Sequence, residues 1–395
     1  MAAPARVGLD AFGLDPTVLH WNHGSFGACP RAALAAQAEV RARLEAATMR
    51  YFRLDYEPAL AAARGAVAAF LGADPAGLVF VPNATTGVAT AVADVALAPG
   101  DEVVTTTHAY RACRNQLDRA AAAARATVVI APVPVPVRDP DAAITAILAR
   151  VGPRTRLVLV DHVTSPTALV TDVGRLARAL PAHVALIVDG AHAPGQLDLA
   201  IDDVGATYYA GNLHKWTCAP KGAGFLWASP ARRAHLRPLV TSHGASLPGD
   251  RYRLEHDWTG TCDPSAYLAA PVAIATVAEL GGGWPAVRRG NQQLAAAVAA
   301  ELGGQLGADP VIDPAIAAEA QGAMAALAVT LPAGAGALAV ERALLERGVE
   351  VPIVDHPAST GPLVRVSAHV YNTLAEVAPL VDHLRAIGVT GRRLD

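Results

Sequence analysis

The sequence predicts an α/β protein with a large, doubly wound and mostly parallel sheet and a smaller C-terminal α+β domain. Its 395 residues are too many for one ordinary core, so two domains are expected. Up to residue 228, short apolar runs alternate with alanine-rich helical segments, which is the arrangement of a parallel sheet flanked by helices. After Pro264 long helices come first and strands follow, which indicates a separate unit.

Two alanine-rich helices with spaced charges are predicted first, over 32–47 and 57–71. Strands and helices then alternate. The predicted strands cover 78–81, 101–107, 127–135, 155–163, 183–192, 206–212 and 222–228. The helices between them open at Thr85-Thr86 and cover 111–126, 141–152 and 173–180.

The C-terminal unit is predicted to begin with two long helices separated by "GGGW". Its elements are helices over 266–280, 286–302 and 337–347 and strands over 325–331 and 363–370. We therefore expect an N-terminal segment (1–18), a large domain (19–269) and a small domain (270–395).

Composition excludes several classes of function. A net charge of −3 and a pI near 6.5 leave no electrostatic footprint for nucleic acid or an anionic membrane. The start of the chain has no apolar core of signal-peptide length, and the most apolar long tract, 315–340, is interrupted by polar residues and a proline. The chain has four scattered cysteines and no CxxC pair: Cys29, Cys113, Cys218 and Cys262. We therefore expect no disulfide framework, no structural zinc site and a cytoplasmic setting.

Two charged residues stand in unusual places. Asp189 ends the apolar run "VALIV", where a buried carboxylate is costly without a cationic partner. Lys215 lies one strand further on, in "YYAGNLHKW", among apolar residues that should lower its pKa. Singly, Asp189 reads as a turn residue and Lys215 as a snorkelling lysine. Together they fit pyridoxal 5'-phosphate (PLP), whose aldehyde needs a lysine and whose pyridinium nitrogen needs a carboxylate.

A third feature matches the phosphate of such a cofactor. "NATTG" (83–87) places hydroxyls and backbone amides at a helix start, which suits an anion but is also an ordinary N-cap. The carboxyl ends of parallel strands bring such residues together, and Thr85, Tyr110, Ser165, Asp189 and Lys215 all follow predicted strands. No strand is followed by GxGxxG, so a dinucleotide site is not supported.

These motifs resemble the class V aminotransferase family of fold type I PLP-dependent enzymes. The resemblance rests on "VDGAHAPGQLDL", "YYAGNLHKW" and "VRVSAHVYNT", and "LHWNHGSFGACP" narrows it to the isopenicillin N epimerase-like branch. It covers residues 18 to 375 and implies a PLP-binding large domain, a homodimer with shared active sites, and the fold type I transferase fold.

The resemblance also implies roles for individual residues. Lys215 would form the Schiff base with the cofactor and move protons, Asp189 would hold the ring nitrogen, and Tyr110 would stack on the ring. Further cofactor contacts would come from Thr85, Thr86, Ser165, His192, Asn212 and His214, with Thr261 reaching the phosphate of the neighbouring subunit. The family usually has glycine where this chain has Ala168.

On the substrate side, Arg365 would clamp the α-carboxylate, a bidentate role suited to arginine. Asn22, His23 and Ser25 of "NHGSFG" would also lie near the substrate. Each residue has a bland alternative, such as a core aromatic for Tyr110 or a strand arginine for Arg365. Jointly, at these strand ends, those alternatives become improbable. No histidine pair has a metal-ligand spacing such as HExxH, so no metal is expected.

The family's chemistry leaves several reactions open. The stretch "VEVPIVDHPASTGPLVRVSA" before and around Arg365 has no cysteine, which argues against desulfurization through a protein persulfide. We expect action at the α-carbon of an amino acid or amino-acid conjugate, epimerase-like, in natural-product biosynthesis. The alternatives are a C–S lyase, an oxidative deaminase or decarboxylase of the same branch, an aminotransferase, and a non-catalytic PLP-binding regulatory protein.

Overall fold

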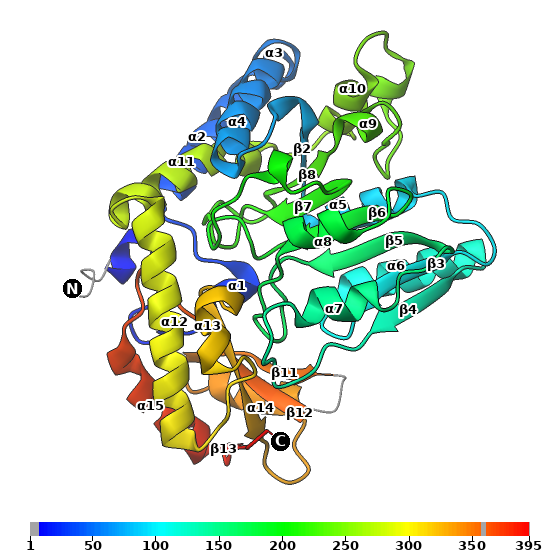
Figure 1. Ribbon diagram of the computed structural model, residues 1–395. Helices are drawn as coiled ribbons and strands as arrows, with labels where there is room; N and C mark the ends of the chain where they lie inside the picture. The colour runs from blue at the N-terminus through cyan, green and yellow to red at the C-terminus, as the bar shows by residue number, and fades with distance from the viewer. Residues whose placement is uncertain (1–7, 357–360, 395) are drawn as a thin grey trace.

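The computed structural model describes residues 8–356 and 361–394 (Figure 1). The first seven residues of the predicted N-terminal segment lie outside this range. So do residues 357–360, which belong to the cysteine-free stretch before Arg365.

A seven-stranded sheet forms the centre of the large domain. Its strands lie in the spatial order β2 (Leu78–Val81), β8 (Gly224–Ala228), β7 (Tyr208–Asn212), β6 (Ala185–Gly190), β5 (Thr155–Asp161), β3 (Glu102–Thr106) and β4 (Thr127–Ala131). Only β8 runs antiparallel to its neighbours; the other described pairings are parallel. The mostly parallel sheet predicted from the alternation is therefore confirmed.

Helices cover both faces of this sheet, as a doubly wound fold requires. On one face α5 (Ala84–Asp94) and α6 (Arg111–Ala124) pack on alternate strand residues such as Ile187. On the other, α7 (Ala142–Leu148) and α8 (Val173–Ala179) pack on the intervening residues, such as Val188. The central strands β5 and β6 thus bury both of their sides, which explains why their sequences are nearly continuous apolar runs.

A second helical layer lies beside the β2 and β8 edge (Figure 1). Here α11 (Ser265–Leu280) packs on α2 (Arg31–Ala46) and α4 (Tyr56–Leu71) through small residues of α11 that include Ala266, Ala270 and Ala273. The shorter helices of this region are α3 (Thr48–Arg50), a π-helical turn (Tyr51–Asp55), α9 (Pro230–Arg233) and α10 (Arg251–Asp257).

The C-terminal unit contains a four-stranded antiparallel sheet. Its order is β11 (Ile353–His356), β12 (Gly361–Ser367), β9 (Met324–Thr330) and β13 (Thr390–Gly391). The long helix α12 (Trp284–Leu306), α15 (Val377–Ala386) and α14 (Ala337–Leu345) share its apolar core. A one-turn helix, α13 (Ala317–Ala320), precedes β9.

Residues near the N-terminus connect the two sheets. β1 (Leu19–His20) pairs in parallel with β10 (Val349–Glu350), and Asn22 bridges to Ser367 of β12. The one-turn helix α1 (His23–Phe26) follows and lies between the large and small sheets (Figure 1). The "NHGSFG" motif is thereby placed beside the carboxyl ends of the large sheet.

Some predicted elements are longer than the observed ones. The strand predicted over 127–135 ends at Ala131, because Pro132 and Pro134 cannot donate to a ladder. The helix predicted over 141–152 ends at Leu148, close to the bend before Pro153.

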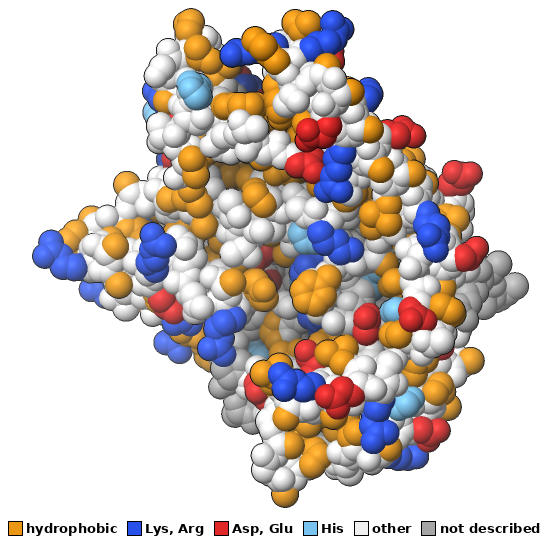
Figure 2. Space-filling view, turned by 180° about the vertical axis from the view of Figure 1, so that it is seen from behind, with side chains coloured by type: hydrophobic (Ala, Val, Ile, Leu, Met, Phe, Trp, Pro, Cys, Tyr) orange, Lys and Arg blue, Asp and Glu red, His pale blue; other side chains and the backbone are white. Residues whose placement is uncertain are grey.

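No single helix among the described residues is long and apolar enough to cross a membrane; α11 and α12 reach that threshold only as a pair bent by 70°. On the face shown in Figure 2, acidic and basic side chains are interspersed, and the surface is hollowed near its centre.

Candidate active site

A cavity of about 180 Å³ lies where β5, β6 and β7 end and α5 begins. It is lined by nine residues that the sequence predicted for the site: Ser25, Thr85, Tyr110, Ser165, Asp189, His192, Asn212, His214 and Lys215. Residues more than 180 positions apart therefore meet at the edge of the sheet where the predicted strands end.

Lys215 stands on the loop that follows β7, with its side chain directed into this cavity. Its Nζ lies 3.0 Å from Nε2 of His192. Burial and the Arg365 charge lower the pKa of the amine, Asp189 and Asp161 oppose them, and the resulting pKa is about 8. Burial and the Lys215 charge also hold the pKa of His192 well below its usual range, and the Trp216 Nε1–H donates to its Nδ1 (3.4 Å).

Backbone hydrogen bonds and a close contact with Gly27 hold the loop that carries Lys215. The Cys218 N–H donates to the Lys215 carbonyl (3.0 Å), and the Ala219 N–H donates to the Leu213 carbonyl (3.0 Å). Gly27, at φ 71, approaches so closely that an added Cβ would lie 2.0 Å from the His214 carbonyl oxygen. The glycine after "NHGSF" thus lets the N-terminal segment lie directly on the lysine loop.

Asp189 ends β6 and is buried. Its Oδ1 accepts from the Ala191 N–H (3.0 Å), and its Oδ2 accepts from the Cys113 thiol (3.0 Å). Burial raises the pKa of Asp189, and the Cys113 hydrogen bond, the Ala191 hydrogen bond and the Lys215 charge oppose that rise. A carboxylate so placed attracts a cation into the cavity.

Asp161 is a second buried carboxylate in the same cavity, and the sequence reasoning missed it. It ends β5 directly beside Asp189, with which it is paired in the parallel ladder. Its Oδ2 accepts from the Tyr110 N–H (3.1 Å). Burial and the neighbouring Asp189 charge raise the pKa of Asp161 well above its usual range.

The start of α5 forms another wall of the cavity. The Asn83 side chain caps the helix by accepting from the Thr86 N–H (2.9 Å), and the Asn212 Oδ1 accepts from the Ala84 N–H (2.8 Å). Thr85 lines the cavity, whereas the Thr86 hydroxyl lies 3.1 Å from Asn83 Oδ1. Nδ1 of His214 lies 2.9 Å from the Ala223 carbonyl oxygen, and burial lowers the pKa of His214 to about 4.

Arg365 of β12 is only 3% exposed, and its guanidinium contacts residues at both ends of the site. One terminal nitrogen donates to the Ser165 carbonyl (2.7 Å) and hydroxyl (3.1 Å). The other donates to Ser25 Oγ (2.8 Å) and Asn22 Oδ1 (3.2 Å). Its Nε has no partner among the described residues. Burial lowers the pKa of Arg365 to about 10.

Tyr110 and Ser165 both line the cavity. Tyr110 precedes α6 and is 41% exposed. Burial of the rest raises its pKa. Ser165 follows β5 and holds Arg365.

Five predicted residues are not part of the cavity lining: Asn22, His23, Thr86, Thr261 and Arg365. His23 points to Tyr371, with its Nδ1 2.8 Å from the Tyr371 hydroxyl, and its Nε2 lies 3.1 Å from the Lys215 carbonyl oxygen. His23 therefore contacts the backbone of the lysine loop and not the side chain of Lys215. Thr261 is exposed on the segment before α11.

His23, Cys218 and His369 form a buried cluster whose ligand atoms lie within 4.8 Å of one another. The rings of His23 and His369 are stacked, with centroids 3.9 Å apart at 18°. Two imidazoles that bind one tetrahedral zinc ion each direct a nitrogen at the metal, and the usual Zn–N distances then put their ring centroids roughly 5 Å apart. The stacked rings of His23 and His369 are closer together than this. The cluster is better described as packing behind Lys215.

Among the residues that were missed, Asp161 had a signal in the sequence. It ends "RLVLV" as Asp189 ends "VALIV". Cys113 and Phe26 had none, because a thiol on a helix and a phenylalanine in a turn are ordinary until the fold places them beside Asp189 and the cavity.

Comparisons with known proteins agree with the resemblance. The sequence model of the family "Aminotransferase class-V" matches residues 48–380. The chain is 37% identical to the isopenicillin N epimerase of Amycolatopsis lactamdurans, covering 95% of this chain and 96% of that protein. It is 33% identical to the putative L-cysteine desulfhydrase 2 of Oryza sativa subsp. japonica, covering 96% and 87%.

Solved structures share the fold. The cystine C-S lyase C-DES in complex with cysteine persulfide has a TM-score of 0.80 at 21% identity, covering 94% of this chain and 98% of that one. A second structure of C-DES, with glycine covalently linked to its PLP cofactor, has a TM-score of 0.78, also at 21% identity, covering 96% and 99%. The predicted fold class and family resemblance are therefore confirmed.

Proposed function

The chain belongs to the aminotransferase class-V family of PLP-dependent enzymes, and from this premise we propose that it acts at the α-carbon of an amino acid or amino-acid conjugate. The proposed reaction is epimerase-like and serves natural-product biosynthesis. One observation carries this proposal: the buried Lys215 amine, with its pKa lowered to about 8, shares a cavity with the buried Asp189 carboxylate.

The residues of the cavity fit PLP chemically. The paired carboxylates Asp189 and Asp161 provide a negative environment for the pyridinium nitrogen, and Lys215 provides the amine for the aldehyde. The start of α5, with the Thr85 and Thr86 hydroxyls, suits the phosphate, and Asn212 and His214 line the same cavity. Tyr110 would stack on the pyridine ring of PLP, and Ser165 and His192 would lie beside that ring. PLP supplies an electron sink for the charge left when a bond at the α-carbon breaks.

In this proposal Lys215 moves the α-proton. The lowered pKa leaves much of the amine neutral near pH 8, as a general base must be, and the hydrogen bond between Nζ and His192 Nε2 (3.0 Å) keeps the amine directed into the cavity. Burial excludes the water that would compete for the proton.

Arg365 is proposed to bind the substrate α-carboxylate. Its terminal nitrogens are held by Asn22, Ser25 and Ser165, which fix the plane of the guanidinium. Because hydroxyls are weaker acceptors than a carboxylate, an incoming carboxylate would displace them and gain charge-assisted bonds. His23 would act indirectly, by supporting the lysine loop.

We also propose a homodimer with shared active sites, in which the exposed Thr261 reaches the phosphate of the partner's cofactor. A cytoplasmic setting remains our prediction, and it agrees with four cysteines that are all free.

A C–S lyase is the second candidate. Its support is the similarity to the L-cysteine desulfhydrase and the C-S lyase fold. Lyase chemistry needs no protein thiolate, and burial raises the pKa of Cys113, the thiol beside Asp189, far above its usual range. Cys113 therefore stays a thiol, and a persulfide there is not proposed.

One experiment separates these reactions. The holoenzyme is incubated in deuterium oxide with amino acids, amino-acid conjugates and thioethers, and the products are analysed by mass spectrometry and chiral chromatography. Deuterium at the α-carbon with inverted configuration supports the proposal. Pyruvate with a free thiol supports the lyase. Conversion that requires a keto acid, or that consumes oxygen, would contradict both in favour of an aminotransferase or an oxidative deaminase.

A further inference from the structure

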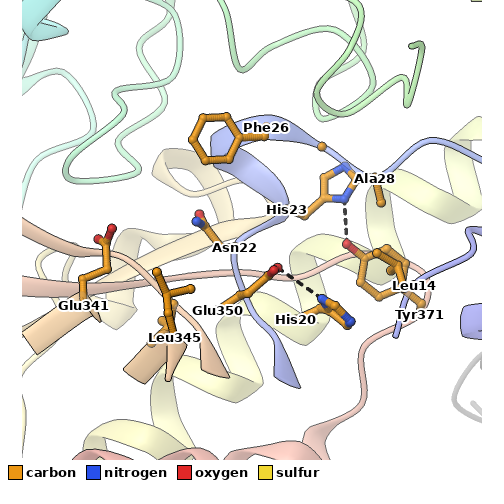
Figure 3. Close-up of a pocket in the computed structure, with 12 residues that line it drawn as sticks. Leu14, His20, Asn22, His23, Phe26, Ala28, Glu341, Leu345, Glu350 and Tyr371 are labelled. Carbon is orange, nitrogen blue, oxygen red and sulfur yellow. Dashed lines mark hydrogen bonds and ion pairs between the residues drawn. The ribbon is translucent and has the colours of Figure 1, made fainter. Parts of the chain in front are cut away.

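A second cavity, of about 310 Å³, is lined in part by His23 and Phe26 of α1 (Figure 3). It is larger than the candidate active site. Its walls come from the N-terminal segment, α14, β10 and the segment after β12, and they include Asn22, Phe26, Glu341, Leu345 and Glu350. Nothing in the chemistry proposed above uses it.

The two cavities share a wall. Phe26 lines both, and the Phe26 side chain is 70% exposed, so little packing holds it in place. Asn22 lines the second cavity while its Oδ1 accepts from Arg365 and from the Ser25 hydroxyl. The proposed carboxylate-binding arginine therefore lies directly behind this wall. A substrate held there by its α-carboxylate has the second cavity within reach of its side chain.

The charge of the second cavity is negative. Glu350 is paired with His20, whose Nδ1 lies 3.2 Å from its Oε2. Glu341 forms no salt bridge in the described part of the chain; its Oε2 accepts from the Ile353 N–H (3.3 Å), and its charge raises the pKa of the buried Arg365 against the effect of burial. Figure 3 shows Asn22 between the Glu341 and Glu350 side chains, with Glu350 directed toward His20. Apolar atoms of Leu14, Leu345 and Val351 line the rest.

We propose that this cavity is a substrate subsite that takes a side chain ending in a cation, such as an ammonium or amidinium group, with Glu341 as its partner. The apolar lining suits the methylene chain that leads to such a group, and the unpaired carboxylate suits its end. A carboxylate-ended side chain is disfavoured by like charge. This inference rests on the proposed function, because it assumes that the substrate is anchored at Arg365.

The test measures binding of matched ligands to the holoenzyme through the change in its visible absorption. Lysine, norleucine and 2-aminoadipate differ at the end of side chains of similar length. Nε-glycyl-lysine and Nε-propionyl-lysine repeat the ammonium and methyl endings at greater length. We expect at least one ammonium-ended ligand to bind about tenfold more tightly than its methyl-ended match, the usual effect of one charge-assisted hydrogen bond.

Variants connect that preference to Glu341. Glu341→Gln should abolish it, whereas Glu346→Gln, an exposed position at the end of the same helix, should retain it. Leu345→Arg places a cation at an exposed position of the cavity wall and should reverse the preference toward 2-aminoadipate. The inference is overturned if ammonium and methyl endings bind equally at both lengths, or if the preference survives in Glu341→Gln.

The same samples are tested for α-proton exchange in deuterium oxide. Absence of exchange with every amino acid, alanine included, counts against the proposed function alone, since the ending preference is read from binding. Exchange with alanine but no preference between endings counts against the subsite alone.

Discussion

The Lys215 amine differs from an ordinary lysine because of its surroundings. Burial removes water from the charged form, and the Arg365 charge adds to the effect, while the carboxylates of Asp189 and Asp161 limit it. The result is a pKa of about 8 instead of 10.5. Without the paired carboxylates the amine would be still less basic, so Asp161 contributes to the properties of Lys215 as well as to those of Asp189.

The capture of PLP by the apoenzyme should therefore have a distinctive pH dependence. The neutral amine is the nucleophile, and its fraction rises with pH until it passes the pKa. We expect the capture rate, followed by visible absorption after mixing, to rise up to about pH 8 and then level off. A rate that keeps rising toward pH 10 would mean that Lys215 has an ordinary pKa.

Cys113 is expected to act as a positioning residue for Asp189. Its thiol donates to Oδ2, and this contact lowers the pKa of Asp189 against the effect of burial. Cys113→Ala should reduce kcat about two- to tenfold, the usual effect of one lost hydrogen bond, with little change in KM. Cys113→Ser, which keeps a donor, should recover most of the loss, and the exposed Cys262→Ala serves as control. Equal losses in the Ala and Ser variants would indicate a packing role only.

At the scale of elements, the site depends on how closely the N-terminal segment approaches the lysine loop. α1 lies on the loop because Gly27 has no side chain, and His23 reaches the Lys215 carbonyl from the same helix. On the other side, Cys218 takes a left-handed φ of 61° so that the loop can close back toward β8. The position of the loop thus depends on two residues with positive φ, Gly27 after α1 and Cys218 in the loop itself.

Gly27→Ala should disrupt this contact. Its Cβ would lie 2.0 Å from the His214 carbonyl oxygen, and its φ of 71° costs a side chain about 1–2 kcal/mol in addition. Gly100→Ala is the matched control, since Gly100 also has a positive φ but faces open space. Chemical denaturation should show a larger loss of stability for Gly27→Ala, together with loss of bound PLP. Equal losses in the two variants would contradict the account of the loop.

Sequence patterns predicted the regular elements of the large domain because each has a strong local signal. Strands buried on both faces are continuous apolar runs, and Gly72 ends α4 in the left-handed conformation. The family pattern also drew attention to Ala168, which has a φ of 61° where glycine is usual. The helix α15 had a signal in buried Val377, Leu380, Val381 and Leu384 that was not used.

Other parts of the site could not be read from sequence. β1, β10 and β13 have two residues each, too few for any periodicity, and their pairing is decided by tertiary contacts. The same is true of the contacts of Arg365, whose partners Asn22 and Ser165 are 343 and 200 positions away.

At the scale of the whole molecule, the parallel pairing of β1 with β10 fastens the N-terminal segment to the small sheet. The His20–Glu350 pair lies on this junction. Burial lowers the pKa of His20, but Glu350 and the Asp15 carbonyl more than offset this, so that the pKa is raised; His20 in turn lowers the pKa of Glu350. Both the placement of α1 and the second cavity depend on this junction.

The contribution of this pair to stability should vary with pH. The raised pKa of His20 stabilises the fold fully below about pH 6.5, and the effect is lost as pH rises through the folded value. The lowered pKa of Glu350 contributes above about pH 4.5. A double-mutant cycle of His20→Gln and Glu350→Gln should give a coupling below about 1 kcal/mol near pH 6, since Glu350 is half exposed, and none at pH 9. Coupling that is equal at both pH values would contradict the ion pair.

The most direct test of the account is to trap PLP on the protein and locate it. The chain has two lysines, Lys215 in the cavity and Lys221 on the surface, so the assignment has an internal control. Holoenzyme is reduced with borohydride, digested and mapped by mass spectrometry. We predict the pyridoxyl group on Lys215 alone, with a normal yellow holoenzyme from Lys221→Ala and a colourless protein from Lys215→Ala. A modification on Lys221, or a wild-type protein that stays colourless with added PLP, would contradict the central claim.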